Sequence, residues 1–435
     1  MSNRILLRGA ALLSIAAATA CSDNTAKVLG PQPSQGNGIF ESYVSLGNSL
    51  TAGYQSGGIN DSTQQRSYAV LLGRQIMGTR FAYPSLANPG CPPPIANFQT
   101  QARVGNGTST TCALRNGTTA VINNVAVPGA ATIDPDLPSS TLSPNANILT
   151  QLFLGGLNQV QRAAVADPTF ATIWIGNNDV LPAALSGILG AAPGISPGVT
   201  AQQTFQTNYD AMIAALQSSS PRLKSGVLIG VVNVTNAPAL IPVSLLISNA
   251  AFRGAFDLAA GFNAASSDPF KKQPLNIEAN CTANPTTLVS LLIAGQIAAF
   301  RNDSTKAPTA RAGHPPDISC GTSSIYPAPV GQVFILEPAE IAAVTSAVNG
   351  YNTYISTKAG SIGFAYLNPN QALDSLKALN EITPPNFALA TAPFGKWISL
   401  DGIHPTSAAH VLLANYLVGV INTKYSTTLA KLPVP

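Results

Sequence analysis

The chain has 435 residues, of which 46% are hydrophobic and 9% are charged, so it has ample apolar material for a core and differs from a disordered chain. Its length allows one large domain or two of ordinary size. The formal net charge of +4 includes Arg4 and Arg8, and the remaining 4 − 2 = +2 is too small to indicate a nucleic acid as partner.

The N-terminal residues have the pattern of an export signal. Two arginines precede an apolar stretch that is too short to span a bilayer, and small residues at 18–20 lead directly into Cys21. We therefore predict a signal peptide over residues 1–20. Residues 21–39 are rich in Gly, Pro, Ser and Gln, which predicts a flexible tether.

The small residues before Cys21 resemble a bacterial lipobox, with Ala18 where Leu is more common. The resemblance implies cleavage before Cys21 and attachment of lipid to its thiol and its new amino group. The protein would then be exported and anchored to a membrane of the cell envelope, with the outer membrane of a Gram-negative bacterium as the expected site. The alternative is a plain signal peptide, an unmodified Cys21, and a periplasmic or extracellular protein.

Short apolar runs alternate with segments of helical periodicity along the rest of the chain. The runs predict five strands, at Tyr43–Leu46, Val121–Val127, Phe170–Ile175, Val227–Val234 and Gly363–Leu367. The helical segments include Ser67–Met77, Pro338–Ile355 and Ser407–Tyr425. This alternation predicts an α/β fold with a doubly wound, mostly parallel sheet, in which ligands bind at the carboxyl ends of the strands.

Two connections are much longer than the others, and we predict insertions at about 85–120 and 237–330 within a domain of residues 40–428. Apart from Cys21 the chain has four cysteines, which allow three pairings, and proximity in the sequence favours Cys91–Cys112 and Cys281–Cys320. A zinc site is less favoured, because the chain has no Cys-x-x-Cys pair and only three histidines.

The longer insertion contains two apolar segments, Leu240–Phe256 and Thr286–Phe300, which are both short for a membrane span. Two interpretations remain open for it. It forms a helical subdomain with a small core of its own, or it forms a cap that walls an apolar substrate cleft.

Residues suited to acyl transfer follow three of the predicted strands. Ser49 follows the first strand, Gly129 follows the second in a Pro-Gly turn, and Asn178 follows the third. The carboxyl ends of parallel strands lie at one edge of a sheet, so these residues are expected to meet there. Ser49 on its own is also a good helix N-cap, so its role as a nucleophile depends on the other residues.

A serine nucleophile needs a base and a carboxylate that orients the base. Asp401 and His404 are three residues apart on a predicted turn before the last helix, so the carboxylate can hold one ring nitrogen while the other faces a serine. His410 falls within that helix and is expected at the surface, and His314 falls in a loop of the longer insertion. Asp401 and His404 are therefore the predicted pair.

The oxyanion of an acyl-transfer intermediate needs preorganised hydrogen-bond donors. The candidates are the backbone N–H of Ser49, the backbone N–H of Gly129 and the side-chain amide of Asn178. Each residue has a plainer interpretation: Gly129 as part of a turn, and Asn178 as a loop or cap residue. Together, and in this order, they indicate an active site.

This set of residues resembles the signature of the SGNH hydrolases, the GDSL esterase/lipase family. Ser49, Gly129, Asn178 and His404 match the four signature residues, and Asp401 matches the Asp-x-x-His motif. The resemblance implies a flavodoxin-like three-layer α/β/α sandwich with a central, mostly parallel five-stranded sheet and helical or loop insertions. It also implies cleavage of ester or acetyl groups without metal or cofactor.

One residue departs from the family pattern, since Asn48 replaces the usual Asp before the serine. We expect activity to be retained, because this position is not part of the triad.

A second motif, Gly-x-Ser-x-Gly around Ser196, matches the nucleophile elbow of other hydrolases. Its serine is followed by Pro197, which has no N–H to serve as the oxyanion donor, so Ser196 is expected to be a loop residue.

The sequence therefore predicts a serine esterase or lipase with catalytic Ser49, Asp401 and His404, acting on a small-molecule or lipid ester and attached to a membrane through its N-terminal lipid. A deacetylase of surface polysaccharide is the enzymatic alternative. The alternative from a different functional class is a ligand-binding lipoprotein with the same fold and no catalytic activity.

Overall fold

The computed structural model describes residues 38–137, 142–190, 198–303, 305, 316–320 and 334–434. These residues belong to one compact unit. The predicted signal peptide, Cys21, Ser196 and His314 lie outside the described residues. Within the described ranges, no helix combines the length and the apolar character needed to cross a membrane.

The centre of the fold is a parallel four-stranded sheet in the order β1-β2-β3-β9. Its strands are β1 (Tyr43–Gly47), β2 (Phe170–Trp174), β3 (Ser225–Ile229) and β9 (Ala365–Leu367). All residues of the first three strands are buried, as expected for strands covered on both faces. Four of the five predicted strands are therefore confirmed, with ends that differ from the predicted ones by up to five residues.

The predicted strand at Val121–Val127 is wrong as a regular element, because only Asn124 forms a bridge, to Ser45 of β1. The segment still runs beside β1 through three backbone hydrogen bonds of 2.8–3.1 Å. The ladder does not extend beyond this bridge, because Tyr43 O of β1 accepts from Asn123 Nδ2 at 2.9 Å and Gly47 N donates to Gln159 Oε1 at 3.0 Å.

This segment nevertheless completes the expected topology. Counted in chain order, the sheet with this edge segment has the order 2-1-3-4-5, which is the flavodoxin-like order. In such sheets the ligand site lies beyond the carboxyl ends of the strands, where the order reverses beside β1. The fold therefore places any site beyond Gly47 and its neighbours.

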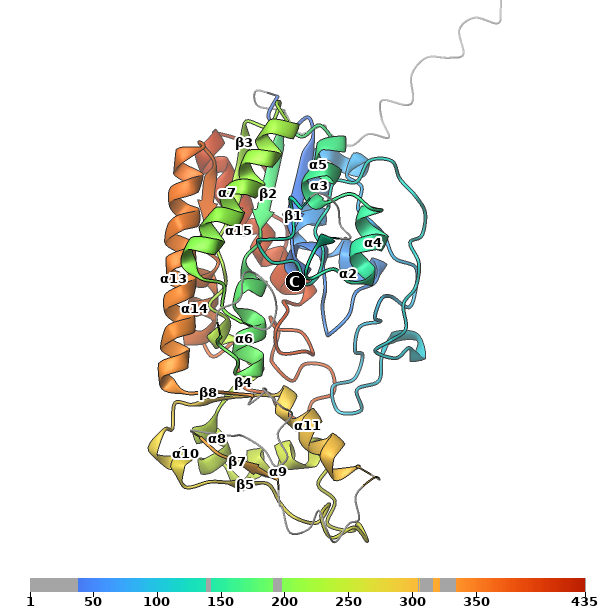
Figure 1. Cartoon of the computed structure of the whole chain (residues 1–435). Coiled ribbons are helices and arrows are strands. Elements are labelled where there is room, and N and C mark those ends of the chain that lie inside the picture. The colour runs from blue at the N-terminus through green and yellow to red at the C-terminus, as the bar shows by residue number, and fades with distance from the viewer. Residues whose placement is uncertain are drawn as a thin grey trace, which may run out of the picture. The chain divides into compact units, whose positions relative to one another are not determined.

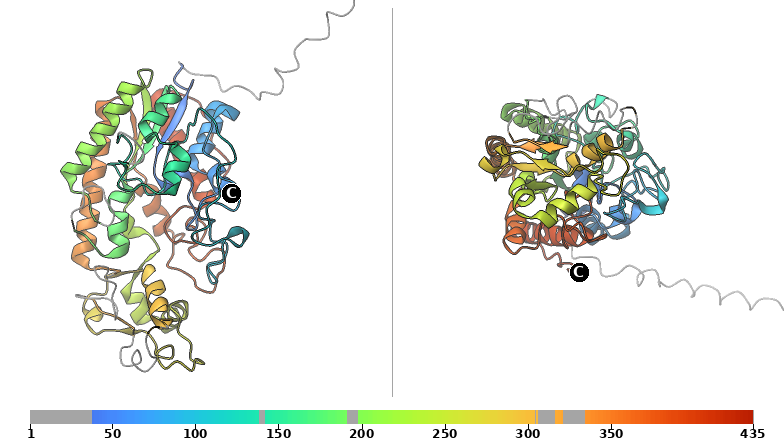
Figure 2. Two further views of the ribbon diagram at one scale, coloured as in Figure 1. Left: turned by 45° about the vertical axis from the view of Figure 1, so that its right-hand side comes forward. Right: turned by 90° about the horizontal axis from the view of Figure 1, so that it is seen from below.

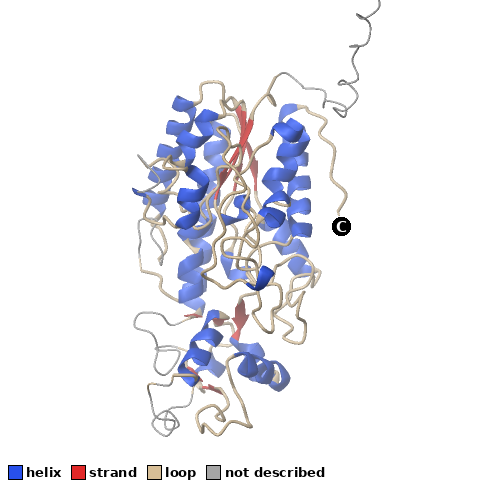
Figure 3. Cartoon of the chain, turned by 90° about the vertical axis from the view of Figure 1, so that its right-hand side faces the viewer, coloured by secondary structure: helices blue, strands red, loops and turns tan. Residues whose placement is uncertain are grey.

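Helices cover both faces of the sheet and form a three-layer α/β/α sandwich, with the strands between two helical layers (Figures 1 and 3). One layer contains α4 (Ile148–Leu154), α5 (Gln159–Val165), α7 (Gln202–Ser219) and α13 (Pro338–Ser361). The other layer contains α3 (Tyr68–Met77) and α15 (Ser407–Tyr425). Alternate strand residues point to opposite layers: Val44 and Ile173 pack in the first, and Tyr43 and Phe170 in the second.

The shorter elements lie in the connections between these strands and helices. They are α1 (Ser49–Ala52), α2 (Asp61–Gln65), α6 (Leu181–Ser186), α14 (Asn370–Ala378), and the 3₁₀ turns η2 (Gly78–Arg80), η3 (Val104–Asn106), η5 (Asn177–Asp179) and η6 (Val234–Asn236). The predicted strand Val227–Val234 ends early because Asn352 binds both the N–H and the carbonyl of Val231, which removes these groups from a ladder.

Both predicted disulfides, Cys91–Cys112 and Cys281–Cys320, are present in the structure. The longer insertion packs around an apolar core of its own, which includes Ile241, Phe256 and Ile293. Its elements are β4 (Leu240–Pro242), α8 (Val243–Ser248), α9 (Ala250–Ala259), β5 (Asn276–Ile277), α10 (Asn280–Ala283), β6 (Leu288–Ser290), α11 (Leu292–Arg301), β7 (Asp317–Ile318) and β8 (Ile335–Leu336). Figure 2 shows this subdomain, in yellow, at one end of the sandwich.

Candidate active site

Three segments far apart in the sequence end at the same edge of the sheet. Gly47 of β1 pairs with Trp174 of β2, and Val127 N donates to Gly47 O at 3.1 Å. The strand ends are therefore level with one another. Two to four positions beyond these ends come Ser49, Gly129 and Asn178.

The first residue of α1 is Ser49, and the residue that caps this helix is Asn48. The Asn48 side chain is buried and accepts a hydrogen bond from Leu50 N at 3.1 Å. Asn48 is therefore the N-cap of α1, a role for which Ser49 was also a candidate from the sequence alone. The Ser49 hydroxyl is left for a different contact.

A continuous chain of hydrogen bonds joins Ser49, His404 and Asp401. Ser49 Oγ lies 2.9 Å from His404 Nε2, and His404 Nδ1 lies 2.8 Å from Asp401 Oδ2. The side chains of His404 and Asp401 are only 12% and 11% exposed. An ionised carboxylate only accepts hydrogen bonds, so Nδ1 carries the ring proton and Nε2 of the neutral ring accepts from the serine hydroxyl.

The carboxylate of Asp401 is held in its ionised form by several donors. Its Oδ1 accepts from Ser399 Oγ, Ile403 N and His404 N, and its Oδ2 also accepts from Gly57 N at 2.7 Å. Burial alone raises the pKa of Asp401, but the adjacent His404 and these backbone donors outweigh it and lower the pKa to about 2. Asp401 therefore remains charged at neutral pH.

The loop after α1 fixes the position of this pair, and sequence reasoning did not identify its residues. Ser56 N donates to Ser399 Oγ at 2.8 Å, and Leu400 N donates to Ser56 Oγ at 3.2 Å. The ring of Tyr54 packs against the His404 imidazole, with ring centroids 4.9 Å apart. No sequence motif marks these residues, because the residues that they contact lie more than 340 positions further along the chain.

Backbone donors at Ser49 and Gly129 are available to a ligand. Gly129 is exposed and has φ of +90°, a conformation that favours glycine, and a Cβ there would meet Asn147 Nδ2 at 3.3 Å. Within the part of the chain that the structure describes, neither the Ser49 N–H nor the Gly129 N–H has an acceptor. Such free N–H groups are the donors that an oxyanion requires.

The side chain of Asn178 joins the Gly129 turn to the end of β2. Its Nδ2 donates to Ala130 O at 2.8 Å, and the partly exposed amide has a second N–H. The structure thus brings Asn178 beside the segment that carries Gly129. Ser49 thus begins α1 and Asn178 lies in η5, while Gly129, Asp401 and His404 lie on loops.

A second link between these two loops comes from Asp179, which the sequence analysis did not single out. Its buried carboxylate accepts from Thr132 Oγ1 at 2.7 Å and from Thr132 N at 3.0 Å. Burial raises the pKa of Asp179 to about 6, and the Thr132 hydrogen bonds only partly oppose this rise. The loops of Gly129 and Asn178 are therefore tied together by a carboxylate whose ionisation is costly.

This raised pKa predicts a measurable effect of pH on stability. Between about pH 4 and pH 6 the native protein binds a proton at Asp179 that the unfolded chain has lost, so stability falls as the pH rises through this window. Relative to Asp179→Asn, the wild-type free energy of unfolding should fall by about 2 kcal/mol between pH 4 and pH 7. Urea unfolding of both proteins across this range measures the difference. If the free energies of unfolding of the wild type and of Asp179→Asn differ by the same amount at every pH, the prediction is wrong.

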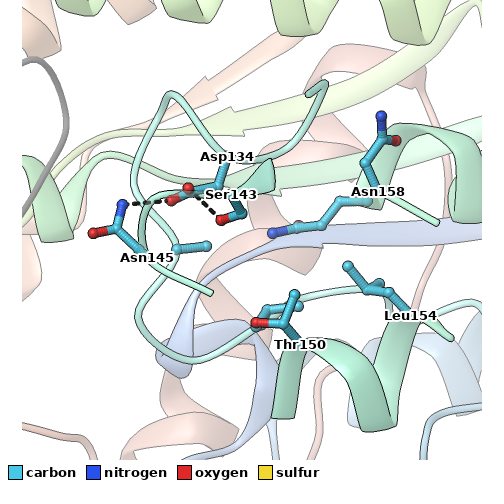
Figure 4. Close-up of a pocket in the computed structure, with 9 residues that line it drawn as sticks. Asp134, Ser143, Asn145, Thr150, Leu154 and Asn158 are labelled. Carbon is cyan, nitrogen blue, oxygen red and sulfur yellow. Dashed lines mark hydrogen bonds between the residues drawn. The ribbon is translucent and has the colours of Figure 1, made fainter. Parts of the chain in front are cut away.

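The segment after Gly129 is also anchored through Asp134, which borders a small hollow (Figure 4). Asp134 accepts from Ser143 Oγ, from Asn145 Nδ2 at 2.8 Å and from Ala131 N at 2.6 Å. These contacts hold residues 129–134 against the following loop. The hollow is too small for a substrate group, so we assign Asp134 a structural role.

The expectation that His410 lies at the surface is wrong. His410 is completely buried where α15 packs on α3, its ring lies against Tyr68, and its Nδ1 accepts from Tyr68 N at 3.3 Å. Burial lowers the pKa of His410 to about 3, so the ring is neutral.

Among the described residues, no group of three His, Cys, Asp or Glu side chains could hold a metal ion.

Comparison with known proteins gave a match to a family model and six matching chains among solved structures. No curated protein matches the sequence. A solved structure of a family two carbohydrate esterase from Clostridium thermocellum in complex with cellohexaose matches with 13% identity and a TM-score of 0.22, over 43% of this chain and 43% of that chain. The chain thus spans less than half of that relative, and a likeness of this degree carries no argument about substrate.

The family match is much broader. Residues 43–417 match the GDSL-like Lipase/Acylhydrolase family, a range that starts at β1 and ends within α15. It includes all the strands of the central sheet and every residue of the hydrogen-bonded chain described above. The chain therefore belongs to the GDSL-like lipase/acylhydrolase family.

Proposed function

We propose that the protein is a serine esterase that cleaves carboxylic esters through an acyl-enzyme on Ser49. The observation that carries this proposal is the unbroken contact from Asp401 through His404 to the Ser49 hydroxyl. His404 Nε2 takes the hydroxyl proton as Ser49 Oγ attacks the ester carbonyl. Asp401 keeps the ring in the correct tautomer and stabilises its protonated form.

Collapse of the tetrahedral intermediate completes the first half of the reaction. The oxygen of the leaving alcohol takes the proton from His404, and the acyl group stays on Ser49. A water molecule then attacks the acyl-enzyme while His404 takes its proton. Collapse of this second intermediate breaks the bond to Ser49 Oγ, which takes the proton from His404, and the acid is released. The N–H groups of Ser49 and Gly129 and the amide of Asn178 stabilise the oxyanion in both steps.

Asn48 lies outside this sequence of proton transfers. Its side-chain oxygen caps α1, which is a function that Asn and Asp perform equally well. Its Nδ2 is buried and has no hydrogen-bond partner among the described residues. The change from the Asp of the family pattern therefore removes a charge near Ser49 but keeps the contact that positions the helix.

Replacement of Asn178 by alanine tests the oxyanion site. We expect kcat on 4-nitrophenyl acetate to fall about a hundred- to a thousand-fold, because one of three donors to the developing charge is lost. The matched control is Asn349→Ala, which truncates an exposed Asn on α13 and should leave kcat unchanged. A folded Asn178→Ala protein with wild-type kcat would remove Asn178 from the proposed mechanism.

A further inference from the structure

A tight turn over Gln55–Gly58 connects the loop after α1 with the proposed catalytic acid. Gly58 N donates to Gln55 O at 3.1 Å, and the two central residues, Ser56 and Gly57, have φ of +53° and +64°. Positive φ at both central positions is the pattern of a type I′ turn. A left-handed backbone is unfavourable for a residue other than glycine, so Ser56 keeps this conformation only where other contacts hold it.

The backbone groups at the tip of this turn bind two different segments. Both N–H groups bind the loop that carries Asp401, and Gly57 N donates to Asp401 Oδ2 at 2.7 Å. Both carbonyls bind the shorter of the two insertions: Ser56 O accepts from Ile95 N at 2.8 Å, and Gly57 O accepts from Arg103 Nη1 at 2.9 Å. The turn therefore joins this insertion to the loop of the catalytic acid.

The side chain of Arg103 fastens the turn to the insertion. Its Nη1 also donates to Pro93 O at 2.6 Å, so one nitrogen bridges a carbonyl of the insertion and a carbonyl of the turn. Hydrogen bonds from an ionised donor are stronger than those between neutral groups. The disulfide Cys91–Cys112 closes the covalent loop that contains both Pro93 and Arg103. Arg103 is therefore a charged clamp on a cross-linked support.

We propose that Arg103 is a positioning residue for the reaction at Ser49. By holding Gly57 O, it keeps the Gly57 N–H on Asp401 Oδ2. The same carboxylate oxygen accepts from His404 Nδ1 at 2.8 Å, so the position of the turn affects the position of the base. This inference rests on the proposed function, since it requires Asp401 to orient His404. It gives the shorter insertion a part in catalysis.

Replacement of Arg103 by methionine removes both side-chain hydrogen bonds and tests the proposal. We expect kcat on 4-nitrophenyl acetate to fall about ten- to a hundred-fold, because a small displacement of a catalytic group has an effect of this size. Both half-reactions use His404, so both slow together and KM should change little.

The matched control is Arg80→Met, which replaces an exposed arginine in η2 and should leave kcat unchanged. Thermal unfolding shows whether each variant is folded at the assay temperature. A folded Arg103→Met protein with wild-type kcat, or one that differs from wild type only in KM, would overturn the proposal.

General loosening of the insertion would also lower kcat, and a double-mutant cycle with Asp401→Asn separates this effect from positioning. If Arg103 acts through Asp401, the Arg103→Met substitution should lower kcat less than about threefold in the Asp401→Asn protein, because the base is no longer oriented there. If the two losses multiply instead, Arg103 acts independently of Asp401 and the proposal is wrong.

The two hypotheses fail in different ways. If Ser49→Ala or Asp401→Asn keeps the wild-type kcat, the proposed mechanism is wrong whatever the Arg103 variants show. If both of those substitutions lower kcat but Arg103→Met does not, only the assignment of Arg103 is wrong.

Discussion

Replacing Ser49 with alanine is expected to lower kcat on 4-nitrophenyl acetate about a million-fold, which is the scale of loss when a triad nucleophile is removed. The hydroxyl of this residue lies 2.9 Å from His404 Nε2. Its removal leaves α1 intact, because the cap of this helix is Asn48. The variant should therefore unfold at the wild-type temperature and retain only the residual rate that binding and oxyanion donors supply.

The control for this experiment is Ser62→Ala, which removes the hydroxyl of an exposed serine on α2 and should leave kcat unchanged. Steady-state rates with purified proteins at equal concentration provide the measurement. A folded Ser49→Ala protein that keeps more than a few per cent of the wild-type rate would show that another residue is the nucleophile.

The second large effect is expected for Asp401→Asn, which should lower kcat about ten-thousand-fold. The amide would face donors on both sides, since Oδ2 accepts from His404 Nδ1 and Gly57 N while Oδ1 accepts from Ile403 N. Either orientation of the amide places an N–H group against another donor. The imidazole would then be held in the wrong tautomer, and its protonated form would lose a charged partner.

A structural loss and a catalytic loss can be separated in this variant. Asp374→Asn replaces an exposed carboxylate on α14 and serves as the matched control, with unchanged kcat and unchanged thermal unfolding. Kinetics are measured well below the unfolding temperature of Asp401→Asn, so that the protein is native in the assay. A kcat within tenfold of wild type under these conditions would show that Asp401 does not orient the base.

The central sheet was predictable because its strands are apolar on both faces. Runs such as Phe170–Trp174 have no polar alternation, and this pattern indicates a strand buried between two layers. The edge segment at Val121–Val127 is apolar apart from Asn123 and Asn124, and the Asn123 side chain replaces a ladder contact by donating to Tyr43 O of β1. Periodicity cannot reveal such contacts, because their partners are remote in the sequence.

The reactive residues of the site were predictable, whereas the residues that position them were not. Ser49 and His404 have few competitors, since each follows a recognisable turn signal and the chain has only three histidines. The loop at Ser56 and Gly57, by contrast, has ordinary turn composition and acquires its role only by folding against Asp401. The buried state of His410 was missed because the face of α15 that packs on α3 depends on the tertiary fold.

The most direct test of the proposed mechanism is covalent labelling of the native protein with a fluorophosphonate, followed by peptide mass spectrometry. The phosphonate reacts with a serine only where a base activates the hydroxyl and donors stabilise the charged oxygen. We predict one label per chain, on Ser49, and no label on Ser49→Ala. Folded wild-type protein that takes up no label, or that carries the label on another serine, would contradict the mechanism.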